Sequence, residues 1–130
     1  MIGFGVIGYG YWGPNLVRNI METADASVVA VSDLRQEQLN LVQARYPRVK
    51  TTTNYRELFS DPAIDAIVVA TPVSSHFKLA LQALQAGKHV LVEKPLVEAV
   101  DEGFRLIDEA ARRGLVLMVD HTFIYTEVGS

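Results

Sequence analysis

Three glycines near the N-terminus have the spacing of a phosphate-binding loop. The apolar run Ile2–Ile7 leads into the pattern G-x-G-x-x-G, formed by Gly8, Gly10 and Gly13. Gly8 permits a tight turn after a strand, Gly10 lets the backbone approach a pyrophosphate, and Gly13 lets a helix pack closely. A helix beginning here would offer free N–H groups and a partial positive charge to phosphates. The loop predicts a dinucleotide site, with an ordinary glycine-rich turn as the alternative.

An acidic residue follows the second apolar run at the distance that such a loop requires. Asp33 ends this run about 20 residues after the last glycine. Its carboxylate would accept hydrogen bonds from a ribose diol and would repel a 2′-phosphate, which favours NAD over NADP. Arg35 lies nearby and could hold such a phosphate, so NADP is the less favoured cofactor. Asp33 could also cap the following helix, and Leu34 beside it is a candidate cofactor contact.

A charged cluster, Glu93-Lys94-Pro95, follows another apolar run. A charged pair at the end of a buried strand is costly unless it is used or paired. The proline restricts Lys94 to extended backbone geometry, which we expect to direct its side chain towards a ligand crevice. An ammonium there could polarise a carbonyl or stabilise an alkoxide beside a nicotinamide. Lys94 is therefore the candidate catalytic residue, with a surface salt bridge as the alternative.

Thr71-Pro72 ends a further apolar run and precedes a helical pattern. Its backbone groups could face a dinucleotide, while Ser74 or Ser75 caps the helix. His76 would lie in the first helical turn and could point into the crevice. The alternative for His76 is a solvated histidine or one whose polar atoms are satisfied in the core.

Two aromatic residues and a second histidine complete the candidates. Tyr11 and Trp12 lie within the glycine loop and could cover the pyrophosphate, although Trp12 could equally pack against the edge of the sheet. His121, directly after Asp120, could reach the nicotinamide side of the crevice. A structural histidine bonded to the backbone is the alternative.

Apolar runs alternate with helical patterns along the chain and predict the elements that hold these residues. We expect strands over residues 2–7, 27–32, 49–53, 64–70, 89–92 and 115–119. Helices are expected from residue 12 or 13 and over residues 36–45, 55–59, 74–86 and 97–113, the last with Leu106, Ile107, Ala110 and Ala111 on its inner face. Right-handed crossovers then give an α/β Rossmann fold, a doubly wound parallel sheet in order 3-2-1-4-5-6 with helices on both faces. The polar clusters all follow strands, so they meet at one edge.

Composition narrows the class of protein. Apolar residues make up 49% of the 130 residues, charged residues 21%, and the net charge is -3. This balance gives no general attraction to nucleic acid or to an anionic membrane. The chain has no cysteine, no histidine spacing typical of a metal site and no apolar run of membrane-spanning length. We expect a cytoplasmic protein without a metal site.

Together these residues resemble the N-terminal domain of the Gfo/Idh/MocA oxidoreductase family. The matching pieces are residues 6–13, Asp33, Ala70-Thr71-Pro72 with His76, and residues 86–95. The resemblance implies hydride transfer between a sugar hydroxyl and NAD(P), with Lys94 at the reacting substrate oxygen and Glu93 near the nicotinamide. Residues 10–15 and 120–123 look most like the branch that acts on nucleotide-linked amino sugars.

The resemblance also implies a second domain that binds the sugar and supplies a histidine acid/base. We expect residues 1–126 to form the dinucleotide-binding domain, residues 127–130 to be a truncated end or tail, and the substrate domain to be absent. The chain alone would then bind NAD(H) and oxidise sugars negligibly, which leaves open whether it is itself an enzyme. A homodimer through the last strand or the missing domain's surface is expected.

Two functions of other classes stay open. The chain could be a non-catalytic NAD-responsive module that works with a partner. It could also bind another nucleotide ligand such as S-adenosylmethionine, which also uses a glycine-rich loop and an acid after the second strand. The Glu93-Lys94-Pro95 cluster argues against this second alternative.

Overall fold

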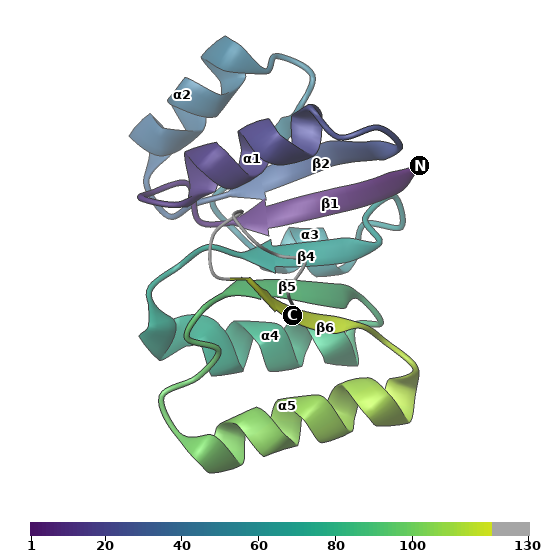
Figure 1. Cartoon of the computed structure of the whole chain (residues 1–130). Helices are drawn as coiled ribbons and strands as arrows, with labels where there is room; N and C mark the ends of the chain where they lie inside the picture. The colour runs from purple at the N-terminus through teal and green to yellow at the C-terminus, as the bar shows by residue number, and fades with distance from the viewer. Residues whose placement is uncertain (121–130) are drawn as a thin grey trace.

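The computed structural model describes residues 1–120, which form a parallel sheet with helices packed against it (Figure 1). The strands are β1 (Ile2–Ile7), β2 (Ala26–Ser32), β3 (Lys50–Thr52), β4 (Ala66–Val69), β5 (His89–Glu93) and β6 (Leu117–Asp120). Their order is β3-β2-β1-β4-β5-β6, and every pairing is parallel. This confirms the predicted doubly wound sheet, whose strand order reverses between β1 and β4.

Helices cover the sheet from both sides. They are α1 (Gly13–Met21), α2 (Gln36–Arg45), α3 (Arg56–Phe59), α4 (His76–Gln85) and α5 (Val100–Arg113), and a single 3-10 turn, η1 (Val73–Ser75), precedes α4. The buried side chains of α1 and α2 share one core cluster, whereas those of α3, α4 and α5 share another. Among residues 1–120, no helix is both long and apolar enough to span a membrane.

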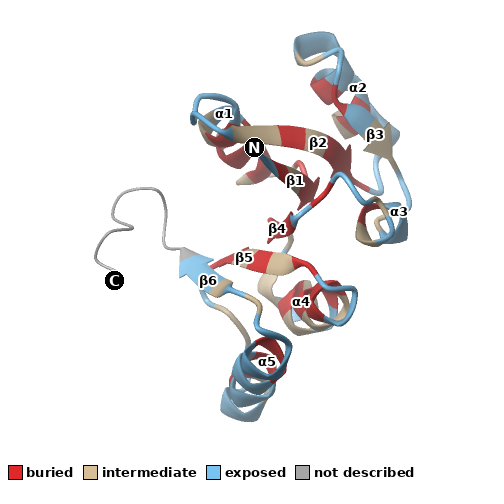
Figure 2. Cartoon of the chain, turned by 90° about the vertical axis from the view of Figure 1, so that its right-hand side faces the viewer, coloured by how far each residue is buried: buried red, intermediate tan, exposed pale blue. Residues whose placement is uncertain are grey.

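The central strands are buried on both faces, as their continuous apolar sequence predicts. Val6 and Val68 pack into the cluster beneath α1 and α2, whereas Ile7 and Val69 pack into the cluster beneath α4. Successive side chains of a strand point to opposite faces, so one short run of residues serves both cores. Figure 2 shows the same gradient, with buried strands in the centre and an exposed β6 at the margin.

Helix α5 differs from the sequence-based expectation. Its first turn begins at Val100 rather than near residue 97, because Leu96 and Val97 pack against the core as part of a loop. Ile107 and Ala111 were expected on the inner face, but both are exposed. Since α5 lies at the margin of the sheet, its buried line is narrow and consists of Gly103, Leu106, Glu109 and Ala110.

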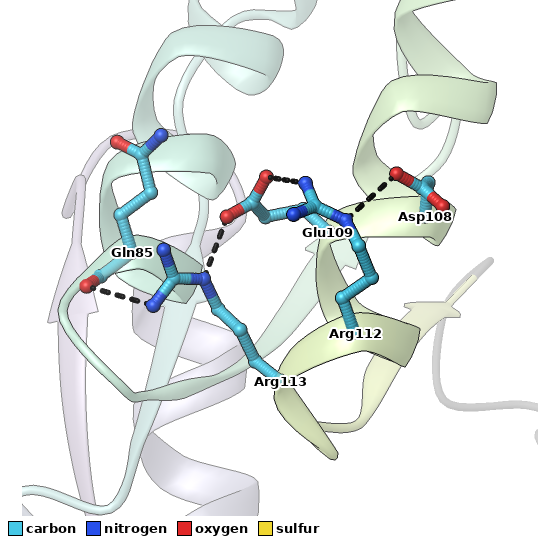
Figure 3. Close-up of polar contacts among 5 residues, drawn as sticks. All are labelled: Gln85, Asp108, Glu109, Arg112 and Arg113. Atoms are coloured by element: carbon cyan, nitrogen blue, oxygen red, sulfur yellow. Dashed lines mark hydrogen bonds and ion pairs between the residues drawn. The ribbon is translucent and has the colours of Figure 1, made fainter.

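A buried carboxylate on α5 binds two arginines at the C-terminal end of that helix, and one of these arginines reaches the end of α4 (Figure 3). The Glu109 side chain is 4% exposed and accepts hydrogen bonds from Arg113 Nε at 2.6 Å and Arg112 Nη2 at 2.8 Å. Arg113 also donates to the backbone carbonyl of Gln85 at 3.5 Å. The hydrogen bond from Arg113 holds the pKa of Glu109 below its usual value, and the nearby arginine charges act in the same direction. These contacts explain how an acidic residue is tolerated on the inner line of α5.

Candidate cofactor site

The loops after β1, β2, β4 and β5 lie at one edge of the sheet because all the strands run in the same direction. The register pairs Ile7 with Ser32 and Val69, and pairs Val69 with Val92. The residues that follow these strand ends are therefore neighbours across the edge. The structure thus brings the glycine loop, Asp33, Thr71 and Lys94 together, as their places after strands predict.

The glycine loop turns sharply from β1 into α1. Gly8 has a φ of +102°, and a side chain there would place its Cβ 2.7 Å from the carbonyl oxygen of Ala70. A Cβ on Gly13 would collide with the carbonyl oxygen of Gly8. Both positions therefore require glycine for steric reasons, one for its backbone conformation and one for close approach. The loop therefore makes a tight turn in which the backbone of Gly13 lies directly against that of Gly8.

The N-terminus of α1 faces this loop without a side-chain cap. Trp12 occupies the N-cap position, makes no capping hydrogen bond through its side chain, and is followed by Pro14 in the first turn. The first turn also contains no acidic residue. The N–H groups and the positive end of the helix dipole are thus available to an anion, which suits the phosphates of a dinucleotide.

Tyr11 and Trp12 pack against each other edge to face, with ring centroids 4.6 Å apart. Trp12 is partly buried and contacts the core cluster beneath α1 and α2, whereas Tyr11 is 83% exposed. The indole therefore packs against the protein, which corresponds to the packing alternative for this residue. That these rings cover a bound pyrophosphate stays a prediction.

Asp33 is buried at the end of β2, and four hydrogen bonds reach its carboxylate. Tyr9 N donates to Oδ2 at 2.8 Å, and Arg35 N donates to Oδ1 at 2.9 Å. The guanidinium of Arg35 adds Nε to Oδ1 at 3.1 Å and Nη2 to Oδ2 at 3.3 Å. Burial opposes ionisation, but these hydrogen bonds outweigh it and hold the pKa of Asp33 below its usual value. Asp33 is therefore held as an ionised hydrogen-bond acceptor directly after β2.

The neighbours of Asp33 correct one expectation. The N-cap residue of α2 is Arg35, without a side-chain capping bond, so Asp33 does not cap this helix. Leu34 is 84% exposed at the edge. Gln38, in the first turn of α2, donates to the carbonyl oxygen of Tyr9 at 2.6 Å and ties α2 to the glycine loop. The sequence signal for this contact is only the position of a glutamine in the turn after Asp33.

His76 lies in the core rather than free in the crevice. The residue is 2% exposed, and its Nε2 lies 2.8 Å from the carbonyl oxygen of Thr71 while its Nδ1 lies 2.9 Å from that of Pro95. This geometry corresponds to the alternative of a satisfied core histidine. The ring joins the loop after β4 to the loop after β5, so its observed contacts have a structural role. A contact between His76 and the cofactor stays a prediction.

The segment between β4 and α4 is also ordered by side-chain contacts. The hydroxyl groups of Thr71 and Ser75 lie 2.6 Å apart, and Ser75 donates to the carbonyl oxygen of Pro72 at 2.8 Å. Ser75 is the N-cap residue of α4 but makes no capping bond with its side chain, so the expected serine cap is wrong. The hydroxyl bonds backwards to the loop because η1 supplies the first turn.

Glu93 and Lys94 differ in exposure although they are adjacent. Glu93 is 4% exposed at the end of β5 and is the register partner of Asp120, whereas Lys94 is exposed at the edge. The Lys94–Pro95 peptide bond is cis, which the sequence alone does not indicate. Lys94 thus directly follows β5, at the same edge of the sheet as the glycine loop. His121, the other candidate, lies outside the described residues.

Comparison with known proteins decides which dinucleotide fold this is. Residues 2–121 match the family described as the oxidoreductase family GFO_IDH_MocA, with an NAD-binding Rossmann fold. The chain belongs to the Gfo/Idh/MocA family. It is the NAD-binding Rossmann domain of this family, which confirms both the resemblance and the favoured cofactor. Within residues 1–120, no three histidine, aspartate or glutamate side chains form a group that could hold a metal ion.

The relatives are longer proteins. The chain is 38% identical to the uncharacterized oxidoreductase YdgJ of Escherichia coli, over 92% of this chain and 34% of YdgJ. It is 32% identical to the myo-inositol 2-dehydrogenase of Thermotoga maritima, over 87% of this chain and 34% of that enzyme. The chain therefore spans about a third of the length of these relatives.

Solved structures show the same domain with either dinucleotide. GenD2 from gentamicin A biosynthesis, in complex with NAD, has a TM-score of 0.90 and 31% identity, covering 95% of this chain and 35% of GenD2. Biliverdin reductase from Synechocystis, in complex with biliverdin and NADP+, has a TM-score of 0.87 and 28% identity, covering 92% of this chain and 38% of the reductase. The same fold thus occurs with NAD in one of these neighbours and with NADP+ in the other.

Proposed function

We propose that this chain is the cofactor-binding part of a dehydrogenase that transfers a hydride between a ring hydroxyl carbon of a sugar or cyclic polyol and NAD. The observation that carries the proposal is one edge of the sheet that holds the phosphate loop, an ionised Asp33 and the exposed Lys94. Relatives named as myo- and scyllo-inositol 2-dehydrogenases support a ring polyol as substrate. A nucleotide-linked amino sugar is the narrower form of the same proposal.

The residues present fit a bound NAD. The cradle formed by Gly8 and Gly13 has no room for side chains, and the uncapped start of α1 would receive the pyrophosphate. The Asp33 carboxylate would accept hydrogen bonds from the adenosine ribose. Tyr11, Trp12, Thr71 and Pro72 would line the remaining cofactor surface. When bound, NAD supplies the hydride acceptor.

Lys94 would act on the substrate rather than on the cofactor. Its ammonium can donate a hydrogen bond to the substrate oxygen and stabilise the negative charge that develops there as the hydride leaves the carbon. Glu93, directly before it, would lie near the nicotinamide. The acid/base that takes the hydroxyl proton and the pocket that orients the ring would come from beyond these 130 residues. We therefore propose that this chain alone binds NAD and oxidises sugars negligibly, since orientation alone contributes roughly 7–11 kcal/mol to such reactions.

The sole tryptophan offers a direct test of cofactor binding. Trp12 stands in the glycine loop, so NADH bound there should quench its fluorescence and receive its excitation energy. Gly10→Glu should abolish this signal, because it places a negative charge in the phosphate loop where a Cβ would meet only Arg35 Nη2, at 3.1 Å. Ala44→Glu, exposed on α2, adds the same charge elsewhere and should leave binding intact. Wild-type protein that shows no calorimetric binding at millimolar NAD would refute the proposal.

A homodimer through β6 forms part of the proposal, as does a cytoplasmic location. β6 is the last strand in the sheet order, and Val116, Met118 and Val119 are 52%, 54% and 40% exposed. An exposed apolar edge strand favours pairing with a second chain. Met118→Lys should therefore lower the mass measured by light scattering at high concentration, whereas Leu41→Lys on α2 should not. A wild-type monomer at all concentrations would contradict the dimer.

A further inference from the structure

The guanidinium of Arg35 is hydrogen-bonded to the Asp33 carboxylate, the group that would bind the ribose of NAD. It donates from Nε and Nη2 to the two oxygens of Asp33, at 3.1 and 3.3 Å. Its Nη2 also lies 3.1 Å from the point where a Cβ on Gly10 would stand, so the side chain extends over the glycine loop. A ribose diol bound to Asp33 would have to use the same oxygens. Arg35 and the ribose therefore compete for one acceptor.

Asp33 would keep its position after the guanidinium leaves. Two backbone N–H groups, those of Tyr9 and Arg35, hold Oδ2 and Oδ1 at 2.8 and 2.9 Å. The Arg35 side chain is 54% exposed, whereas that of Asp33 is 6% exposed. A half-exposed arginine can exchange between conformations at modest cost, because such ion pairs contribute little. The pair therefore has one fixed member and one movable member.

We infer that the Arg35 side chain fills the ribose end of the NAD site in the free protein and that its displacement sets the preference between NAD and NADP. This inference rests on the proposed NAD binding. NAD gains Asp33 only by releasing Arg35, so its apparent affinity falls with the fraction of protein in which Asp33 is open. NADP would bring a 2′-phosphate to the same place, where the released guanidinium can pair with it. Arg35 thus weakens the binding of NAD and strengthens the binding of NADP, so it reduces the difference between the two affinities.

The test compares affinities for NAD and NADP, measured by calorimetry on the whole chain, in wild type and in Arg35→Ala. NAD should bind Arg35→Ala about two- to fivefold more tightly, which is the fold-change that an exposed ion pair of this kind corresponds to. NADP should bind it at least about tenfold more weakly, since one charge-assisted contact to the phosphate is lost. Arg48→Ala, exposed in the loop between α2 and β3, removes the same charge and should change neither affinity.

A second variant separates displacement from charge. Arg35→Gln keeps a polar side chain of similar reach but cannot form the bidentate ion pair, so it should resemble Arg35→Ala for both dinucleotides. Wild type that binds NAD with the same affinity as Arg35→Ala would overturn this inference and leave the proposed function standing. Tighter binding of both dinucleotides to Arg35→Ala would also overturn it. Wild type that binds neither would refute the proposed function and this inference together.

Discussion

The two halves of the candidate site are built in different ways. The half that runs from β1 through α1 to β2 is held mainly by contacts among residues 1–35. Gly8 N donates to the carbonyl oxygen of Ser32, Tyr9 N donates to the Asp33 carboxylate, and Gly13 packs against the carbonyl oxygen of Gly8. The half that follows β4 and β5 depends on His76, which joins two loops from different strands. A sequence motif is therefore enough to predict the first half. The second half needs the whole fold to exist.

The two halves also differ in how far the elements around them are buried. The clusters beneath α1, α2 and α4 bury all of β4 and the C-terminal part of β1, whereas α5 and β6 leave large apolar side chains exposed, including Phe104, Ile107 and Met118. Figure 2 shows this contrast as red strands that give way to a pale β6. The half that carries Lys94 therefore borders the exposed side chains of α5 and β6.

The largest effect is expected from breaking the local half. Gly13→Ala would push a Cβ into the carbonyl oxygen of Gly8 and move α1 away from the loop. We expect it to lower the free energy of unfolding by about 2–3 kcal/mol and to weaken NAD binding at the same time. Denaturant unfolding and calorimetry would measure both, with exposed Ala44→Ser as the control. Unchanged stability would show that the loop is less tightly packed than the structure indicates.

A smaller effect is expected from breaking the link between the two loops. His76→Ala would leave the carbonyl oxygens of Thr71 and Pro95 without their shared partner. The free energy of unfolding should fall by about 2 kcal/mol, because the hydrogen bond donated by the ring N–H is lost and a cavity forms where the buried ring stood. Lys78→Ala, exposed on the same helix, should change stability little. NAD affinity should fall less than in Gly13→Ala, and an equal loss would contradict the division into two halves.

The exposed margin can be tested through Glu109. Glu109→Gln removes the charge that pairs with Arg112 and Arg113 at the C-terminal end of α5. The Tm should fall by less than in His76→Ala, with NAD affinity unchanged, because α5 borders the second half only. Glu102→Gln, in the first turn of α5, is the matched control. A change in NAD affinity would mean that α5 supports the cofactor loops after all.

The smallest effect is a pH dependence in the local half. The pKa of Asp33 is lower in the folded chain than its ordinary value of 3.8, so the folded state binds fewer protons there than the unfolded state. Its contribution to stability is fully present above pH 3.8 and is lost as the pH falls through the lower folded value. Asp33→Asn should therefore reduce the loss of stability below pH 4 by at most about 1 kcal/mol. Identical acid unfolding of the two proteins would contradict this.

Much of the fold could be predicted from the periodicity of apolar residues in the sequence, but the placement of individual side chains could not. Strand order could be predicted from alternating runs because right-handed crossovers allow few arrangements. The exposure of Ile107 could not be predicted, since a helical pattern does not show how much of a helix the sheet covers. For Arg35, two residues after an acid, the sequence allowed a phosphate partner but did not show the pairing with Asp33. Each of these depends on contacts between segments distant in the chain or on a choice among nearby partners.

By itself, the sequence determined the glycine loop, the acid after the second strand and the placement of Lys94 after the fifth, because backbone sterics and strand periodicity act locally. Only the tertiary structure decided that His76 lies in the core between two loops and that Arg35 rests on Asp33. A polar side chain takes the partners that packing leaves within its reach. For His76 these partners lie in two loops that follow different strands, whereas Arg35 selects a carboxylate only two residues away. The local sequence therefore predicts which residues form the dinucleotide site, whereas the fold determines which contacts their side chains make in the free protein.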